Sequence, residues 1–80
     1  MTHAELLSRI TSDPAVCHGR PCVRGLRIGV ELILGMLEAG DREDEILAAY
    51  PELVSEDIRA CLAFANELTR TRFVDLPHAS

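Results

Sequence analysis

The sequence contains no lysine and no tryptophan, and these absences bear on its binding chemistry and on its core. All eight positively charged residues are therefore arginine, whose planar guanidinium suits carboxylate and phosphate partners better than the point charge of lysine does. A biased genome would give the same preference, so both explanations stay open. Only three residues are aromatic, Tyr50, Phe64 and Phe73, and we therefore expect an aliphatic core of Leu, Ile, Val and Ala.

Long apolar runs are also missing. The stretch around Leu32 is interrupted by Glu31 and Glu38 and is too short to cross a bilayer, and no secretory signal is visible. The three cysteines are an odd number, which predicts reduced thiols in a cytoplasmic protein. Eighty residues, 48% of them hydrophobic and 26% charged, predict one globular domain with a modest core and no membrane contact.

Local signals predict a small mixed segment at the N-terminus. Thr2 and Glu5 have the spacing of a capping box, so a short helix should follow Thr2. The segments around Ile10 and over residues 22–28 are short and bounded by turn residues, which favours two small strands.

The rest of the chain has helical spacing of its apolar residues. We expect three helices there, over residues 30–39, 41–50 and 55–69. A short connector between the last two is typical of a trihelical helix-turn-helix unit. The sequence therefore predicts a mainly α-helical domain with a small N-terminal β element over residues 1–69, and a C-terminal tail over residues 70–80.

Residues 18–28 (HGRPCVRGLRI), the arginine loop, concentrate positive charge on an acidic protein. No acid occurs in residues 14–30, so Arg20, Arg24 and Arg27 give this segment +3, whereas the rest of the chain has five arginines against thirteen acids. A local basic patch can attract phosphate or a carboxylate cluster. Three partners stay open: nucleic acid, an acidic protein, and the acids of this chain or of a second copy.

Three motifs lie along residues 10–67, and the first of them includes the arginine loop. They are ITSDPAVCHGRPCVRGLRI, AGDREDEILAAYPEL and SEDIRACLAFA, and together they resemble the domain of unknown function 433 family. The resemblance implies a homeodomain-like or winged-helix-like fold and the function of a VapB-type antitoxin, paired with a PIN-like nuclease toxin. The chain has Leu26 where members usually carry Thr and Gly29 where they often carry Pro. The first change removes a hydroxyl that could bind a ligand at this turn.

The leading prediction is a non-enzymatic antitoxin of a type II toxin–antitoxin pair, with no cofactor, that self-associates through the apolar helix at residues 30–39. It would bind a PIN-like ribonuclease, with its own operator DNA as a further partner. The alternatives are a stand-alone DNA-binding regulator and an oligomeric interaction module without DNA binding. Candidate residues for the toxin or the nucleic acid are Arg20, Arg24, Arg27, Arg59, Arg70 and Arg72.

The start of the third predicted helix is unfavourable for DNA. A recognition helix points its first residues at base edges between phosphates. Here these residues are Ser55, Glu56 and Asp57, and the two acids would repel phosphate. If the chain binds DNA, we expect the arginine loop to contribute.

Metal binding and catalysis have weaker signals. Cys17, His18 and Cys22 lie close together, but their spacing is a poor match to a four-ligand zinc site. No nucleophile is paired with an evident base, and no phosphate-binding glycine loop is present in the sequence. We therefore predict packed, reduced cysteines, no metal site and no enzymatic activity.

Overall fold

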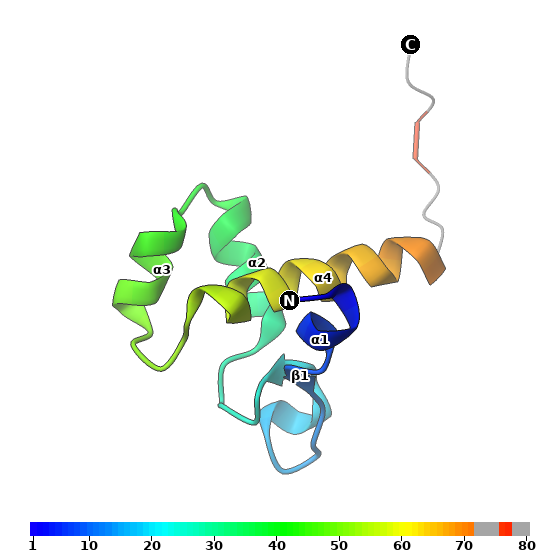
Figure 1. Cartoon of the computed structure of the whole chain (residues 1–80), viewed down its shortest axis with the longest axis horizontal. Coiled ribbons are helices and arrows are strands. Elements are labelled where there is room, and N and C mark those ends of the chain that lie inside the picture. The colour runs from blue at the N-terminus through cyan, green and yellow to red at the C-terminus, as the bar shows by residue number, and fades with distance from the viewer. Residues whose placement is uncertain (72–75, 78–80) are drawn as a thin grey trace.

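The computed structural model describes residues 1–71 and 76–77 (Figure 1). Its elements, in chain order, are α1 (His3–Leu7), β1 (Ile10–Thr11), the 3-10 turn η1 (Cys17–Gly19), β2 (Cys22–Val23), α2 (Val30–Glu38), α3 (Glu43–Ala49) and α4 (Ser55–Thr71). The prediction of a mainly helical domain with a small N-terminal β element is confirmed. Helix α4 continues through Arg70 and Thr71, which we had placed in the tail.

Helix α4 is the central element, because α1, α2, α3 and β1 all pack against it. Figure 1 shows α1 against the middle of α4 and α3 beside its N-terminal half, while the last turns of α4 project beyond the other helices. Helices α2 and α3 also contact each other, so the last three helices form a mutually packed group.

The core is aliphatic, as the scarcity of aromatic residues predicts. Its main cluster of buried side chains draws on the arginine loop and on α2, α3 and α4; the members are Val23, Ile28, Val30, Ile33, Ile46, Leu53, Ile58 and Cys61. A second cluster joins Leu6 of α1 to Ala60 and Ala63 of α4. These alanines allow the short helix to lie close to α4, because they have no side chain beyond Cβ.

The N-terminal β element is smaller than predicted. Strands β1 and β2 pair antiparallel over two residues each, with Ile10 opposite Val23. The second strand stops at Val23 because Arg24 and Gly25 both have positive φ, at 48° and 74°. The Leu26 amide donates to the Val23 carbonyl at 2.8 Å, and two positive φ values inside such a turn are typical of type I′.

Candidate functional site: the arginine loop and its anchor on helix α4

Asp57, in the first turn of α4, is fully buried and accepts hydrogen bonds from two arginines. Arg24 donates from Nε to Oδ1 and from Nη2 to Oδ2, each at 2.8 Å, and Arg9 donates from Nη1 to Oδ1 at 2.9 Å. The Val54 amide also donates to Oδ2, at 2.9 Å. A two-point contact between guanidinium and carboxylate is among the stronger polar contacts in proteins. We call these groups the Asp57 anchor.

The charge of Asp57 is stabilised inside the protein. Burial by itself would raise the pKa of this carboxyl, but the hydrogen bonds from Arg24, the Val54 amide and Arg9 outweigh burial and lower the pKa below its usual value. The hydrogen bond to Asp57 in turn raises the pKa of Arg24. The expectation that Asp57 would face and repel phosphate is therefore wrong, because its carboxylate is buried and paired.

The backbone of Arg24 is part of the same anchor. Its amide donates to the Arg9 carbonyl at 2.7 Å, and its Nη2 also donates to the Glu52 carbonyl at 3.0 Å. A left-handed φ is unfavourable by about 1–2 kcal/mol for a residue with a Cβ. The contacts with Asp57 hold Arg24 in this conformation, and thereby fix the turn of the arginine loop to α4.

Arg9 was not among the site residues predicted from the sequence, and Asp57 was predicted to face solvent, whereas it is buried. One signal was available: Asp57 lies four residues before Cys61 and seven before Phe64, which is the spacing of the apolar side of α4. A carboxylate on a buried stripe needs cationic or amide partners. Nothing in the spacing of Arg9 identified it as one of them.

The remaining candidate arginines have different surroundings. Arg20 pairs with Glu31 at 2.6 Å, but both side chains are largely exposed, so the pair contributes little to stability. Arg70 pairs with Glu67 at 3.6 Å within α4. Arg72 lies outside the described residues.

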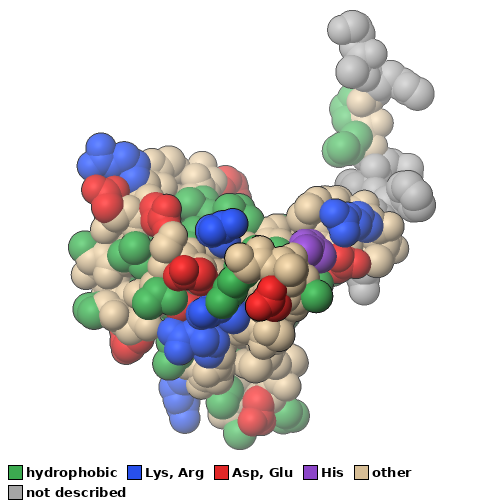
Figure 2. All heavy atoms as spheres, in the orientation of Figure 1, with side chains coloured by type: hydrophobic (Ala, Val, Ile, Leu, Met, Phe, Trp, Pro, Cys, Tyr) green, Lys and Arg blue, Asp and Glu red, His purple; other side chains and the backbone are tan. Residues whose placement is uncertain are grey.

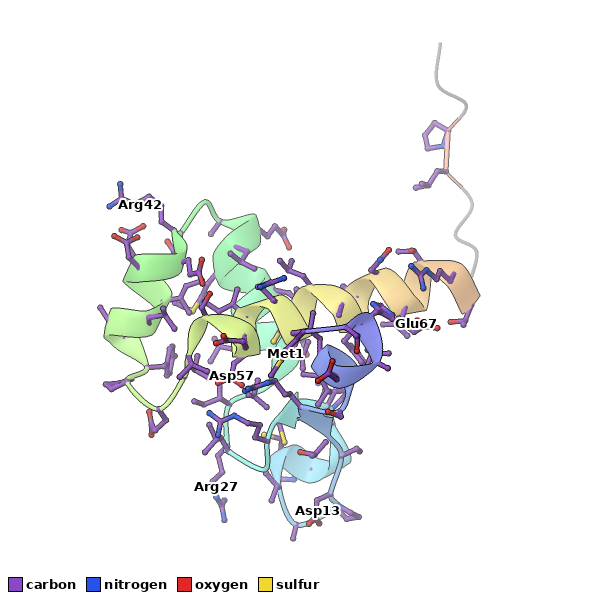
Figure 3. All side chains as sticks on the ribbon, viewed as in Figure 1. Met1, Asp13, Arg27, Arg42, Asp57 and Glu67 are labelled. Atoms are coloured by element: carbon purple, nitrogen blue, oxygen red, sulfur yellow. The ribbon has the colours of Figure 1, made fainter. Side chains whose placement is uncertain are left out.

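Arg27 and Arg59 are exposed, and neither has an ion pair within residues 1–71 and 76–77. Figure 3 shows the Arg27 side chain at the edge of the molecule, pointing away from it. The arginine loop thus divides by role: Arg24 anchors, Arg20 pairs on the surface, and Arg27 faces solvent.

On the face of the molecule that Figure 2 shows, arginine side chains of the described residues are interspersed with acids. Acids also dominate where α3 and α4 begin: Glu43, Asp44 and Glu45 lie in the first turn of α3, and Glu56 follows the first residue of α4. The Ser55 hydroxyl donates to the Glu43 carboxylate.

A groove of about 560 Å³ lies between α2, α4 and the start of the arginine loop. Its apolar walls come from both helices and its rim carries charged residues; the lining residues are Cys17, Arg20, Pro21, Gly29, Val30, Glu31, Leu34, Gly35, Glu38, Phe64 and Leu68. This groove is the second candidate binding surface, and sequence spacing did not reveal it because it depends on how the two helices pack.

The three cysteines are free thiols. Cys22 and Cys61 are fully buried, and burial raises the pKa of the Cys61 thiol to about 12. Cys17 is partly exposed at the groove. The described part of the chain contains no group of three side chains placed to hold a metal ion.

A family model described as a protein of unknown function, DUF433, matches residues 10–65. The chain belongs to the DUF433 family. The matched residues include both Arg24 and Asp57, so the Asp57 anchor lies inside the family region, whereas Arg70 and Arg72 lie beyond it. The predicted resemblance to this family is confirmed.

Two relatives support the membership of the DUF433 family. The uncharacterized protein y4eO of Sinorhizobium fredii (strain NBRC 101917 / NGR234) is 39% identical over 75 residues, which cover 89% of this chain and 34% of y4eO. The chain therefore spans about a third of the length of this curated relative. The crystal structure of a DUF433 member from Anabaena variabilis ATCC 29413 is similar with a TM-score of 0.72 and 29% identity, covering 85% of this chain and 67% of that one.

Within the described residues, none of the helices combines the length and the apolar character needed to span a bilayer.

Proposed function

We propose that this DUF433 chain is the antitoxin of a type II toxin–antitoxin pair, which binds and neutralises a PIN-like ribonuclease and acts by binding rather than by catalysis. One observation carries the proposal: Arg27 extends from a loop that is fixed to the protein body, and its guanidinium has no ion pair among the described residues. The family resemblance supplies the class of the partner.

The chemistry follows from the partner's active site. A PIN-like nuclease gathers carboxylates that hold a divalent metal ion. A guanidinium inserted among them can form two parallel hydrogen bonds with one carboxylate and so compete with the metal or with the RNA. Arg27 would be the inhibiting residue.

The arginine loop is suited to this role because it is already ordered. The Val23 amide donates to the Ile28 carbonyl at 3.0 Å, which closes the loop behind Arg27, and Ile28 itself is buried in the core. The Asp57 anchor fixes the turn that precedes Arg27. Because the loop is ordered before binding, little conformational entropy is lost when the partner docks.

In this proposal, α3 and α4 form the helix-turn-helix unit, since residues 50–54 join them and both helices pack on α2. We do not propose operator DNA as a second partner of this chain. Although Asp57 is paired with arginines, Glu56 lies in the first turn of α4 and Glu43 contacts Ser55 there, and these acids would repel phosphate at the entry of a recognition helix.

Co-expression with the product of the adjacent gene tests the proposal. We expect that product to be a nuclease with a carboxylate-rich metal site, and the two chains to elute as one complex in size-exclusion chromatography. The complex should cleave RNA more slowly than the nuclease alone. An adjacent gene product that is not a nuclease, or two chains that elute separately, would contradict the antitoxin proposal.

A further inference from the structure

The groove between α2 and α4 has apolar walls that remain open to solvent among the described residues. Val30 and Leu34 of α2 face Phe64 and Leu68 of α4 across it, and Leu68 is 43% exposed. Gly35 widens the groove, because a Cβ built at this position would meet no atom within 4 Å. Open apolar surface of this kind marks interaction sites in small proteins.

The charged residues at the rim of the groove indicate which charge an occupant should carry. Arg20 and Glu31 neutralise each other at 2.6 Å. Glu38 also lines the groove, and it has no ion pair within the described ranges 1–71 and 76–77. A complementary occupant is therefore an apolar segment with one positive charge.

Residues 72–76 of this chain supply apolar side chains together with a positive charge for Glu38. Their sequence is RFVDL, with Arg72 at its start, Asp75 near its end and three large apolar residues, and Leu76 is 76% exposed. As an extended segment these five residues would span about 13 Å. The part of α2 that lines the groove, from Val30 to Glu38, has a rise of about 12 Å, so the two lengths match.

We propose that residues 72–76 of one copy lie in the groove of a second copy, with Arg72 beside Glu38 and the apolar side chains over Leu34 and Gly35. This exchange joins two chains through their tails. It adds apolar burial to a domain whose size allows only a modest core. The inference does not depend on the antitoxin function.

The direction of α4 favours a second copy over the chain's own groove. Leu68 lies at the groove only three residues before α4 ends at Thr71, and Figure 1 shows this end of the helix projecting from the body. To enter its own groove, the chain would have to reverse its direction at Arg72 and Phe73. Neither residue type favours a turn, whereas the tail of a second copy needs no reversal.

Substitution of Gly35 tests the groove without weakening the fold, since the position is helical and open. We expect the native chain to be a dimer at micromolar concentration in sedimentation equilibrium. Gly35→Phe should fill the groove and raise the dimer dissociation constant at least about tenfold, while the helical circular dichroism of the chain is retained. Gly35→Ala is the matched control and should remain dimeric. A monomeric native chain, or a Gly35→Phe variant that dimerises as well as the control, would overturn the proposal.

Disulfide trapping identifies the occupant. Cys17 lines the groove, so mild oxidation of a Leu76→Cys variant should link the introduced thiol to Cys17 of the other chain. Mixing isotopically labelled and unlabelled protein should yield mixed cross-linked peptides in mass spectrometry, and adding Cys17→Ser should abolish them. Cross-links confined to single chains would show that the tail occupies its own groove, and no cross-link to Cys17 would show that it occupies neither. Both results overturn the exchange.

Discussion

Arg24 and Asp57, 33 residues apart in the sequence, meet through two hydrogen bonds of 2.8 Å each. The carboxylate is fully buried at the start of α4, and the guanidinium belongs to a turn of the arginine loop. This ion pair gives Arg24 different surroundings from Arg27 in the same loop. Arg24 holds the loop in place, whereas Arg27, three residues later, is exposed and is the residue that we propose contacts the partner.

Replacing Arg24 separates the strength of the ion pair from the strain of its backbone. Arg24→Ala should lower the free energy of unfolding by about 2 kcal/mol. This loss is smaller than the loss expected on breaking a fully buried ion pair, because the Arg24 side chain is 38% exposed and Arg9 still contacts Asp57. Arg24→Gly should lower it by about 1 kcal/mol less, because glycine adopts the positive φ without strain. Urea denaturation of both variants measures the difference. Equal losses would mean that the left-handed turn is not strained.

The Asp57 anchor should also make the stability depend on pH. The pKa of Asp57 is lower in the folded protein than its ordinary value of about 4, so the anchor contributes its full stability above that value. This contribution is lost as the pH falls below about 4 towards the folded pKa, because the unfolded chain then binds a proton more readily.

Asp57→Asn provides the control for this pH dependence, since it keeps the shape and removes the titrating group. The variant should be less stable than the native protein at pH 7, and the difference between them should shrink as the pH falls below 4. Thermal melts over a pH series give this comparison. A difference that stays constant down to pH 2 would show that the Asp57 charge is not stabilised by folding.

Gly35 is expected to lower the stability of α2, while the absence of a side chain at this position leaves the groove open. A glycine inside a helix is less favourable than alanine by about 0.5–1 kcal/mol, and the added methyl group of Gly35→Ala would meet no neighbour within 4 Å. For a domain of this size, the substitution should raise the melting temperature by about 3–6 °C. Differential scanning calorimetry tests this expectation, and a lowered melting temperature would mean that the methyl group clashes.

The parts of the fold that depend on neighbouring residues could be predicted from the sequence. The capping box of Thr2 and Glu5 is present, with bonds of 3.0 and 3.1 Å. The apolar spacing predicted the helix at residues 30–39, which the structure has as α2. These signals act within one or two turns of the chain, where residue types determine the local structure.

The parts that depend on tertiary packing could not be predicted. The charge imbalance marked Arg24 but did not distinguish it from Arg20 and Arg27, since their roles depend on which acids the fold brings near. Asp57 resembled an ordinary acid of a helix start, although its partners come from the arginine loop and from Arg9. The groove depends on the packing of α2 against α4, and residue spacing carries no information about that distance.

The measurement that tests the central claim most directly is a titration of the partner ribonuclease with three forms of this chain: native, Arg27→Ala and Arg59→Ala. Both arginines are exposed and without an ion pair in the described structure. The free energy of unfolding of each variant should therefore lie within about 1 kcal/mol of that of the native protein, as is usual for surface substitutions. Loss of a bidentate contact with a buried carboxylate should raise the inhibition constant of Arg27→Ala at least about 30-fold, equivalent to about 2 kcal/mol. Arg59→Ala should inhibit like the native chain. Equal inhibition by the Arg27→Ala variant and the native protein would contradict the account.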